Sequence, residues 1–317
     1  MSTRTIISVW RLGITCKSSV WVLRRGICCA YRCHHLGRDL LAGGHMSLSS
    51  NHELLLTTGG SLSLQAASDL RLTAVGGVHA QSASSLALSA ATSAAITGDA
   101  GLTLTSDGVT SIGAGTDLLL AADETLLATA PRVHLVSPYE VAINATSVLR
   151  GVARDIHLSA EAGVTVASDN VELLSLQQLQ LSSSGRISLE SSATTGGGPS
   201  GIAVVAADDV EVMALADVVL SSAADTAVTA GNDVSVHATR NLDVVGMSSV
   251  NVTTAGALDL ESASDMALTS YGGITARASG NVDLSSAQSL SVHATAPLNL
   301  ASDSTISIEV RAYWYTS

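Results

Sequence analysis

Apolar residues recur along most of the chain as pairs separated by one residue, and the pairs repeat every eighth position. In residues 233–268 the pairs are Val234 and Val236, Leu242 and Val244, Val250 and Val252, Leu258 and Leu260, and Met266 and Leu268. Alternation with a period of two is typical of a β-strand with one buried face. An eight-residue step on a 3.6-residue helix would scatter the pairs around all its sides, which excludes an α-helix. Each eight-residue unit, here called an octad, is therefore predicted to form one short strand.

The octads keep their phase over most of residues 46–310. They begin at Met46 and recur every eight residues to Leu126, and they run again without a slip from Val210 to Ile306. Between these runs the pattern predicts seven-residue steps at 126–133, 141–148 and 164–171, and a Gly/Pro loop insertion at 192–201. About 33 octads result, and self-similarity of this length indicates a repeat fold.

The residue before each apolar pair is often an Asp or Asn. Such side chains bond nearby backbone and favour a bend, so each octad is predicted to be one strand followed by one corner. The corner positions with this property are Asp69, Asp117, Asp209, Asp217, Asp225, Asp233, Asn241, Asp265 and Asn281.

Strands this short must stack on neighbours, so the fold is predicted to be all-β, an elongated β-helix or β-solenoid. Two architectures satisfy the pattern. In a single-chain solenoid three octads form each coil, and the rod is roughly 53 Å long at ~4.8 Å per layer. In an intertwined trimer each chain gives one strand per layer, and the same spacing gives roughly 160 Å. Because no 24-residue modulation is visible on top of the octads, the intertwined form is preferred. Either form leaves open β-edges at its ends, which need a cap.

Composition supports a thin rod. The chain has 317 residues and no Phe, aromatic residues make up only 3%, and charged residues make up only 13%. A core of aliphatic side chains without rings must be narrow to reach normal packing density. Five segments are predicted: a basic, Cys-containing leader outside the fold (1–45), a first octad region (46–191), a loop insertion (192–201), a second octad region (202–310) and an aromatic tail (311–317).

Charge divides at the same boundary. Residues 1–45 carry a net charge of +6 and all four Cys, whereas the remainder carries −18 and no Lys. An acidic rod repels nucleic acid, so no nucleic-acid partner is expected. The sequence contains no run of eighteen apolar residues, so it predicts no membrane-spanning helix.

Strings such as DVSVHATRNLDVVG and GALDLESASDMALTS resemble the octad β-helix of VgrG proteins and contractile-phage tail spikes. That resemblance implies an intertwined trimeric needle. The stretch SPYEVAINATSVLRGVARDIHLSAEAGVTVAS is similar to the ectodomain repeats of sarcoglycans, which are membrane proteins at the muscle cell surface. The large N-terminal hub of the first family and the C-terminal Cys cluster of the second are not found in this chain.

Candidate chemistry is sparse. His79, His134 and His157 lie between the two apolar members of their octads and His237 and His293 follow theirs, which predicts solvated surface histidines. The cluster Cys28, Cys29, Cys33, His34 and His35 offers metal-ligand types, but its spacing matches no standard zinc site. The Gly-Gly-x-Gly-x-Asp calcium repeat is absent, and no nucleophile, base and acid form a recognisable motif. No catalytic, cofactor-binding or metal residue is predicted.

The sequence therefore predicts a non-enzymatic structural rod of spike, stalk or spacer type that self-associates as a homotrimer or with other β-helix subunits. The alternative is a sarcoglycan-like or adhesin-like cell-surface protein that binds partners along its shaft. A third class, a solenoid enzyme of the polysaccharide-lyase kind, needs a cleft, and the repeat is broken only near residues 192–201. The sequence leaves the compartment open and favours an extracellular or cell-surface, membrane-associated location.

Overall fold

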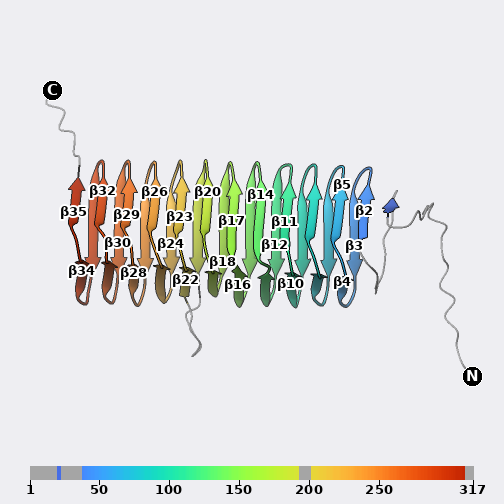
Figure 1. The fold of residues 1–317 in the computed structure, drawn as a ribbon, viewed down its shortest axis with the longest axis horizontal. Coiled ribbons are helices and arrows are strands. Elements are labelled where there is room, and N and C mark those ends of the chain that lie inside the picture. Colours follow the sequence, from blue (N-terminus) through green and yellow to red (C-terminus); the bar gives the residue numbers. More distant parts are fainter. Residues whose placement is uncertain (1–19, 23–37, 193–200, 311–317) are drawn as a thin grey trace, which may run out of the picture.

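The computed structural model describes residues 20–22, 38–192 and 201–310, and these form a straight single-chain β-solenoid (Figure 1). Each octad contributes one strand, and three consecutive octads complete one coil with three sides. Strands on the same side stack as a parallel sheet, so the molecule has three sheets, here called A, B and C. The prediction of an all-β solenoid built from octads is confirmed.

Sheet A has 13 strands in the order β1 (Val20–Val22), β2 (Arg38–Ala42), β5 (Leu62–Ala66), β8 (Leu86–Ala90), β11 (Val109–Ala114), β14 (Arg132–Ser137), β17 (Asp155–Ala160), β20 (Leu179–Ser183), β23 (Val210–Ala214), β26 (Val234–Ala238), β29 (Leu258–Ser262), β32 (Val282–Ser286) and β35 (Ile306–Val310). Sheet B has 11 strands, β3 (Met46–Ser50), β6 (Leu70–Ala74), β9 (Ala94–Gly98), β12 (Asp117–Ala122), β15 (Glu140–Ala145), β18 (Gly163–Ser168), β21 (Arg186–Ser191), β24 (Val218–Ser222), β27 (Leu242–Gly246), β30 (Asp265–Ser270) and β33 (Ser289–Ala294). Sheet C also has 11, β4 (Leu54–Thr58), β7 (Val78–Ser82), β10 (Gly101–Ser106), β13 (Thr125–Thr129), β16 (Val148–Ala153), β19 (Asn170–Ser175), β22 (Gly201–Ala206), β25 (Asp225–Ala230), β28 (Val250–Thr254), β31 (Ile274–Ala278) and β34 (Leu298–Ser302).

The pairing decides between the two architectures left open by the sequence. Each strand pairs with the strand three places later in the same chain, as Val234 of β26 does with Leu258 of β29, 24 residues on. The preference for three intertwined chains was therefore wrong. That preference was based on the equivalence of successive octads, but all three sides of this coil are built from short strands of the same kind. Equivalent octads are thus compatible with a single chain.

The register changes near the middle of the solenoid. The offset between paired residues is 24 at Leu102 and Leu126, falls to 22 at Leu149 and Val171, and rises to 31 between Val171 and Ile202, across the insertion. One predicted step is misplaced. Val148 is only partly buried, and Leu149 takes the inward position, so the seven-residue step lies at 149–156 rather than 141–148.

The core is a continuous aliphatic column. Val234, Leu242 and Val250 are each at most 1% exposed, as the octad pattern predicts. Most strands bury three alternating residues, and the third is small, usually Ala, Ser, Gly or Thr, because it lies at the corner. In β16 the second inward position is Gly151, stacked on Ala128, and a cavity of about 30 Å³ lies beside them. That space is too small for an organic ligand.

The two ends of the described solenoid differ. Sheet A begins upstream of residue 46, because β2 pairs with β5 and β1 pairs with β2, so part of the predicted leader belongs to the sheet. Inward residues near this end, such as Met46 and Leu54, are 2% exposed. At the opposite end the inward residues of β34 and β35 are open. Across the described ranges, no helix has the length and apolarity needed to cross a bilayer.

Candidate functional site

The corner acids hold successive coils together. Asp233 Oδ1 accepts from the backbone N–H of Ala257 at 2.7 Å, and Asp217 and Asp69 accept in the same way from residues 24 positions later. These bonds reach the next coil, whereas the sequence predicted bonds to nearby backbone. The N–H of Ser93 is the main cause that holds the pKa of Asp69 below its ordinary value. Corner acids therefore have a structural role.

Buried corner hydroxyls connect the coils a second time. Ser82 Oγ lies 2.6 Å from the carbonyl oxygen of Gly60 and 2.9 Å from that of Ser85, and it also accepts from the N–H of Ser84. Equivalent contacts to the preceding coil are made by Ser175, Ser262, Ser286 and Ser302. The carbonyl and amide groups of the corner are thereby satisfied without water.

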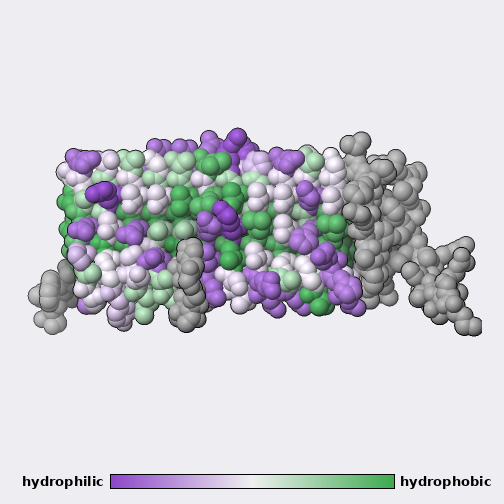
Figure 2. Space-filling view, turned by 90° about the horizontal axis from the view of Figure 1, so that it is seen from below, coloured by the Kyte–Doolittle hydropathy of each residue, from purple (hydrophilic) through white to green (hydrophobic). Residues whose placement is uncertain are grey.

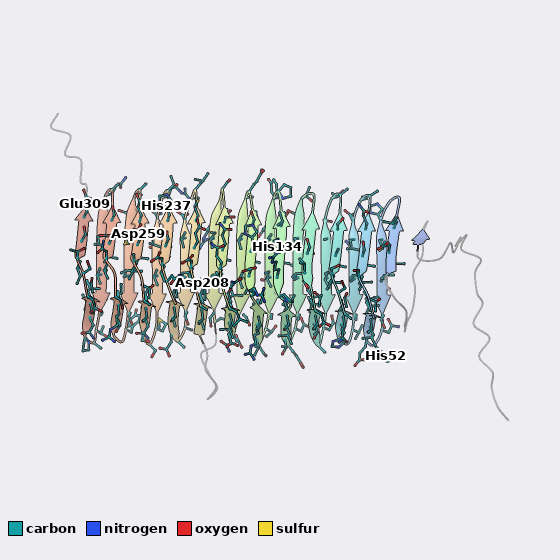
Figure 3. All side chains as sticks on the ribbon, viewed as in Figure 1. His52, His134, Asp208, His237, Asp259 and Glu309 are labelled. Atoms are coloured by element: carbon teal, nitrogen blue, oxygen red, sulfur yellow. The ribbon has the colours of Figure 1, made fainter. Side chains whose placement is uncertain are left out.

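Polar side chains form a row along the outward face of sheet A (Figure 3). The rings of His134 and His157 are 5.8 Å apart, His157 Nδ1 lies 2.8 Å from Gln180 Oε1, and Gln180 Nε2 donates to Glu211 Oε2 at 2.9 Å. The histidines project outward, as predicted. Their approach was missed, although a separation of 23 residues is the signal that places two residues on adjacent coils.

A second, acidic group lies further along the same face. His237 Nδ1 is 3.0 Å from Glu261 Oε2, and Asp259 stacks directly on Asp283 in the next strand. Burial is the main cause that raises the pKa of Asp259 above its ordinary value, and the nearby negative charges of Glu261 and Asp283 raise it further. Within the part of the chain that the structure describes, however, no three His, Cys, Asp or Glu side chains are placed to hold a metal ion.

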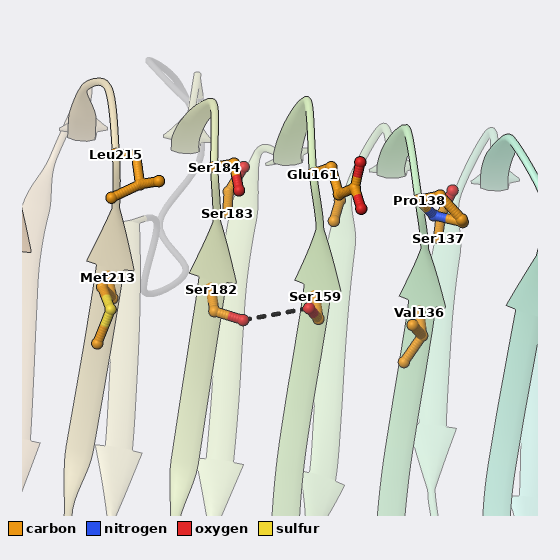
Figure 4. Close-up of a pocket in the computed structure, with 11 residues that line it drawn as sticks. Val136, Ser137, Pro138, Ser159, Glu161, Ser182, Ser183, Ser184, Met213 and Leu215 are labelled. Atoms are coloured by element: carbon orange, nitrogen blue, oxygen red, sulfur yellow. Dashed lines mark hydrogen bonds between the residues drawn. The ribbon is translucent and has the colours of Figure 1, made fainter.

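A shallow groove of about 430 Å³ crosses four coils beside the row of polar side chains (Figure 4). Its floor contains Ser159 and Ser182, whose hydroxyls are 3.2 Å apart. The exposed side chains of Val136 and Met213 stand at its two ends, because β14 and β23 carry larger residues at the outward position where β17 and β20 carry serine. The groove thus has a hydroxyl floor and apolar ends, and its lining residues include no nucleophile paired with a base.

The outward face of sheet C is more apolar. Figure 2 views the solenoid from the side on which sheet C lies and shows apolar patches that polar residues interrupt. In consecutive strands near the middle, Val152, Leu174 and Val205 stack outward as a short apolar band, next to an ion pair between Arg150 and Glu172 at 3.0 Å. A band of this kind can take part in an interface.

Two groups of sequence candidates lie outside the described residues: the Cys and His cluster of residues 28–35, and the aromatic residues of 311–317. The insertion at 192–201 is described only at its edges. Gly201, its last residue, has a φ of +155°, and a Cβ there would lie 2.4 Å from the carbonyl oxygen of Asp225. Glycine is thus required where the chain re-enters the solenoid.

Comparison of the chain with protein-family models, curated proteins and solved structures gives no match. The similarities to phage spikes and sarcoglycans therefore depend on the octad pattern alone.

Proposed function

We propose that the protein is a non-enzymatic structural rod, a spike, stalk or spacer that holds two attachments at a fixed separation. The observation that supports this function is the uninterrupted aliphatic core, which extends from Ala42 of β2 to Leu284 of β32. Every coil is bonded to the next through three sheets, and corner acids and hydroxyls add bonds between many of the coils. A body connected in this way resists bending, and its length depends on the number of coils.

Rigidity can be tested by spin labels at Ser63 of β5 and Ser285 of β32, with the four natural Cys replaced by Ser. Both residues face outward on sheet A, nine strand spacings apart, so a rigid rod gives a narrow distance distribution centred at ~43 Å. Deletion of one coil, residues 234–257, should shorten this distance by ~4.8 Å. A 12-residue deletion of 234–245 is the matched control, because it destroys the octad phase and should unfold the region. A broad distribution in the intact chain would contradict the proposal.

The groove on sheet A and the apolar band on sheet C support the alternative, a surface protein that binds partners along its shaft. The two functions respond differently to mutation. A shaft-binding protein loses attachment to cell-surface glycans or proteins when Leu174→Ser changes the apolar band, and it tolerates deletion of the distant coil 234–257. A spacer tolerates Leu174→Ser and changes its reach when the coil is deleted. Binding of labelled protein to intact cells, measured for both variants, distinguishes them.

A further inference from the structure

The last described coil leaves the end of the core open. The final strands of the three sheets are β33, β34 and β35, and each presents one unpaired edge. Inward side chains of the last two strands are 45% exposed at Ile306, 54% at Ile308 and 46% at Leu298. Open edges and exposed apolar residues together favour pairing with another strand.

Residues 311–317, which follow β35, continue the octad register. Trp314 comes eight residues after Ile306 and 24 residues after Leu290, which is the first inward residue of β33. Three residues separate β34 from β35, and three residues, 311–313, precede Trp314. The order of the sheets places the strand after β35 in sheet B, whose open edge is β33.

The type of residue at this position is also distinctive. No aromatic side chain is buried in the described core, whose inward positions hold aliphatic and small residues. Three of the eight aromatic residues of the chain, Tyr313, Trp314 and Tyr315, occur in these seven residues. An indole ring buries more apolar area than the aliphatic residues that line the core, and it can span a narrow core where a Leu cannot. We propose that residues 314–317 pair with β33 as the next strand of sheet B, with Trp314 covering the end of the core.

A second copy of the chain fits this end less well. A three-sided coil with sides of eight residues has a cross-section of roughly 300 Å². Stable protein interfaces bury about 800 Å² on each partner, so two ends in contact would bury too little area. Residues 314–317 are tethered to β35 by a three-residue corner, which gives them a high effective concentration at β33. This inference does not depend on the proposed function.

The register can be tested by disulfide formation in the full chain with its four natural Cys replaced by Ser. Ser291 faces outward on β33, and residue 315 would be its partner 24 positions later. Their Cα atoms would lie ~4.8 Å apart, within the range of a disulfide, so Ser291→Cys with Tyr315→Cys should oxidise to an intramolecular bond. The control is Ser291→Cys with Tyr313→Cys, whose Cα atoms would lie about 8 Å apart, too far for a disulfide.

Rapid intramolecular oxidation of the first pair, with at least a tenfold slower reaction of the control, supports the proposal. Equal rates for the two pairs would overturn it, as would a disulfide-linked dimer, which would assign the end to a second copy. Dye binding gives a second measurement on the same protein. Trp314→Ser should increase fluorescence of a dye that binds exposed apolar surface, whereas Tyr315→Ser, at the outward position, should leave it unchanged. An equal response of the two variants would contradict a covering role for Trp314.

Discussion

Thr110 and Thr226 offer a matched test of how the core treats a hydroxyl group. Both occupy the first inward position of a strand and both are 0% exposed. Thr110 stacks between Leu86 and Val133, so its neighbours in the sheet are aliphatic. Thr226 Oγ1 donates to a backbone carbonyl oxygen at 3.0 Å, whereas Thr110 Oγ1 has no hydrogen-bond partner among the described residues. Replacement by Val keeps the shape and removes only the hydroxyl.

Only the loss of the Thr110 hydroxyl is expected to stabilise the protein. An unsatisfied buried hydroxyl costs about 1–3 kcal/mol, so Thr110→Val should raise the free energy of unfolding by about that amount. Thr226→Val removes a hydrogen bond whose net contribution is about 0.5–1.5 kcal/mol, and it should lower stability or leave it unchanged. Urea unfolding followed by circular dichroism measures the stability of both variants. The dependence of the unfolding free energy on urea concentration should be the same in each, because a long repeat protein can unfold in parts. If Thr110→Val lowers the midpoint of unfolding, or if both variants shift it equally, the unpaired hydroxyl of Thr110 does not destabilise the core.

Three further predictions concern the corners, the loop and pH. Ser82→Ala should lower the free energy of unfolding by about 1 kcal/mol, because the Ser82 hydroxyl bonds the preceding coil. Ser106→Ala should be neutral or stabilising, because Ser106 Oγ is buried without a partner among the described residues. Thermal unfolding of the two variants measures the difference. Gly201→Ala should lower the free energy of unfolding by more than ~1 kcal/mol. Gly59→Ala is the control in the same assay, because a Cβ at Gly59 meets nothing within 4 Å. The pKa of Asp259 is higher in the folded protein than the ordinary value of 3.8, so its ionised carboxylate destabilises the fold at any pH above the folded pKa. The destabilisation disappears as pH falls below 3.8, where the carboxyl is protonated in both the folded and the unfolded state. Asp259→Asn should therefore stabilise the protein at pH 7 by less than about 1 kcal/mol, since the site is partly exposed, and should do nothing at pH 3; an equal effect at both would exclude an electrostatic cause.

The octad pattern predicts the strands and their buried faces well, because a strand with one face in the core requires alternation at fixed positions. Boundaries near the middle are less certain from sequence. In VLRGVA, residues 148–153, either Val148 or Leu149 can begin the apolar pair. The structure places Leu149 inward, with Gly151 at the second inward position, where the sequence offers no apolar side chain to mark it.

Relations between coils could not be predicted while the number of chains was open. In a single chain residues 23 or 24 apart are neighbours, whereas in an intertwined trimer they are three layers apart. That choice decides whether His134 contacts His157, whether side-chain hydrogen bonds connect His157 to Glu211, and which coils the corner acids join. Sequence alone correctly placed His134 and His157 outward and could not identify the partners of these side chains.

This architecture also limits where function can lie. Alternate strand positions are committed to the core, and many corner side chains are committed to bonds between coils, so only the outward positions and the two ends are free to vary. The outward positions are not uniform along the rod. On sheet A, uncharged residues of β5, β8 and β11 give way to histidines in β14 and β17, and then to acids in β23, β29 and β32, with His237 of β26 among them. Because equal coils need equal inward residues but place no such demand on the outside, this gradient is not a requirement of the fold. It gives the two halves of the face different charge, so a partner that binds along sheet A would meet a surface with a defined direction.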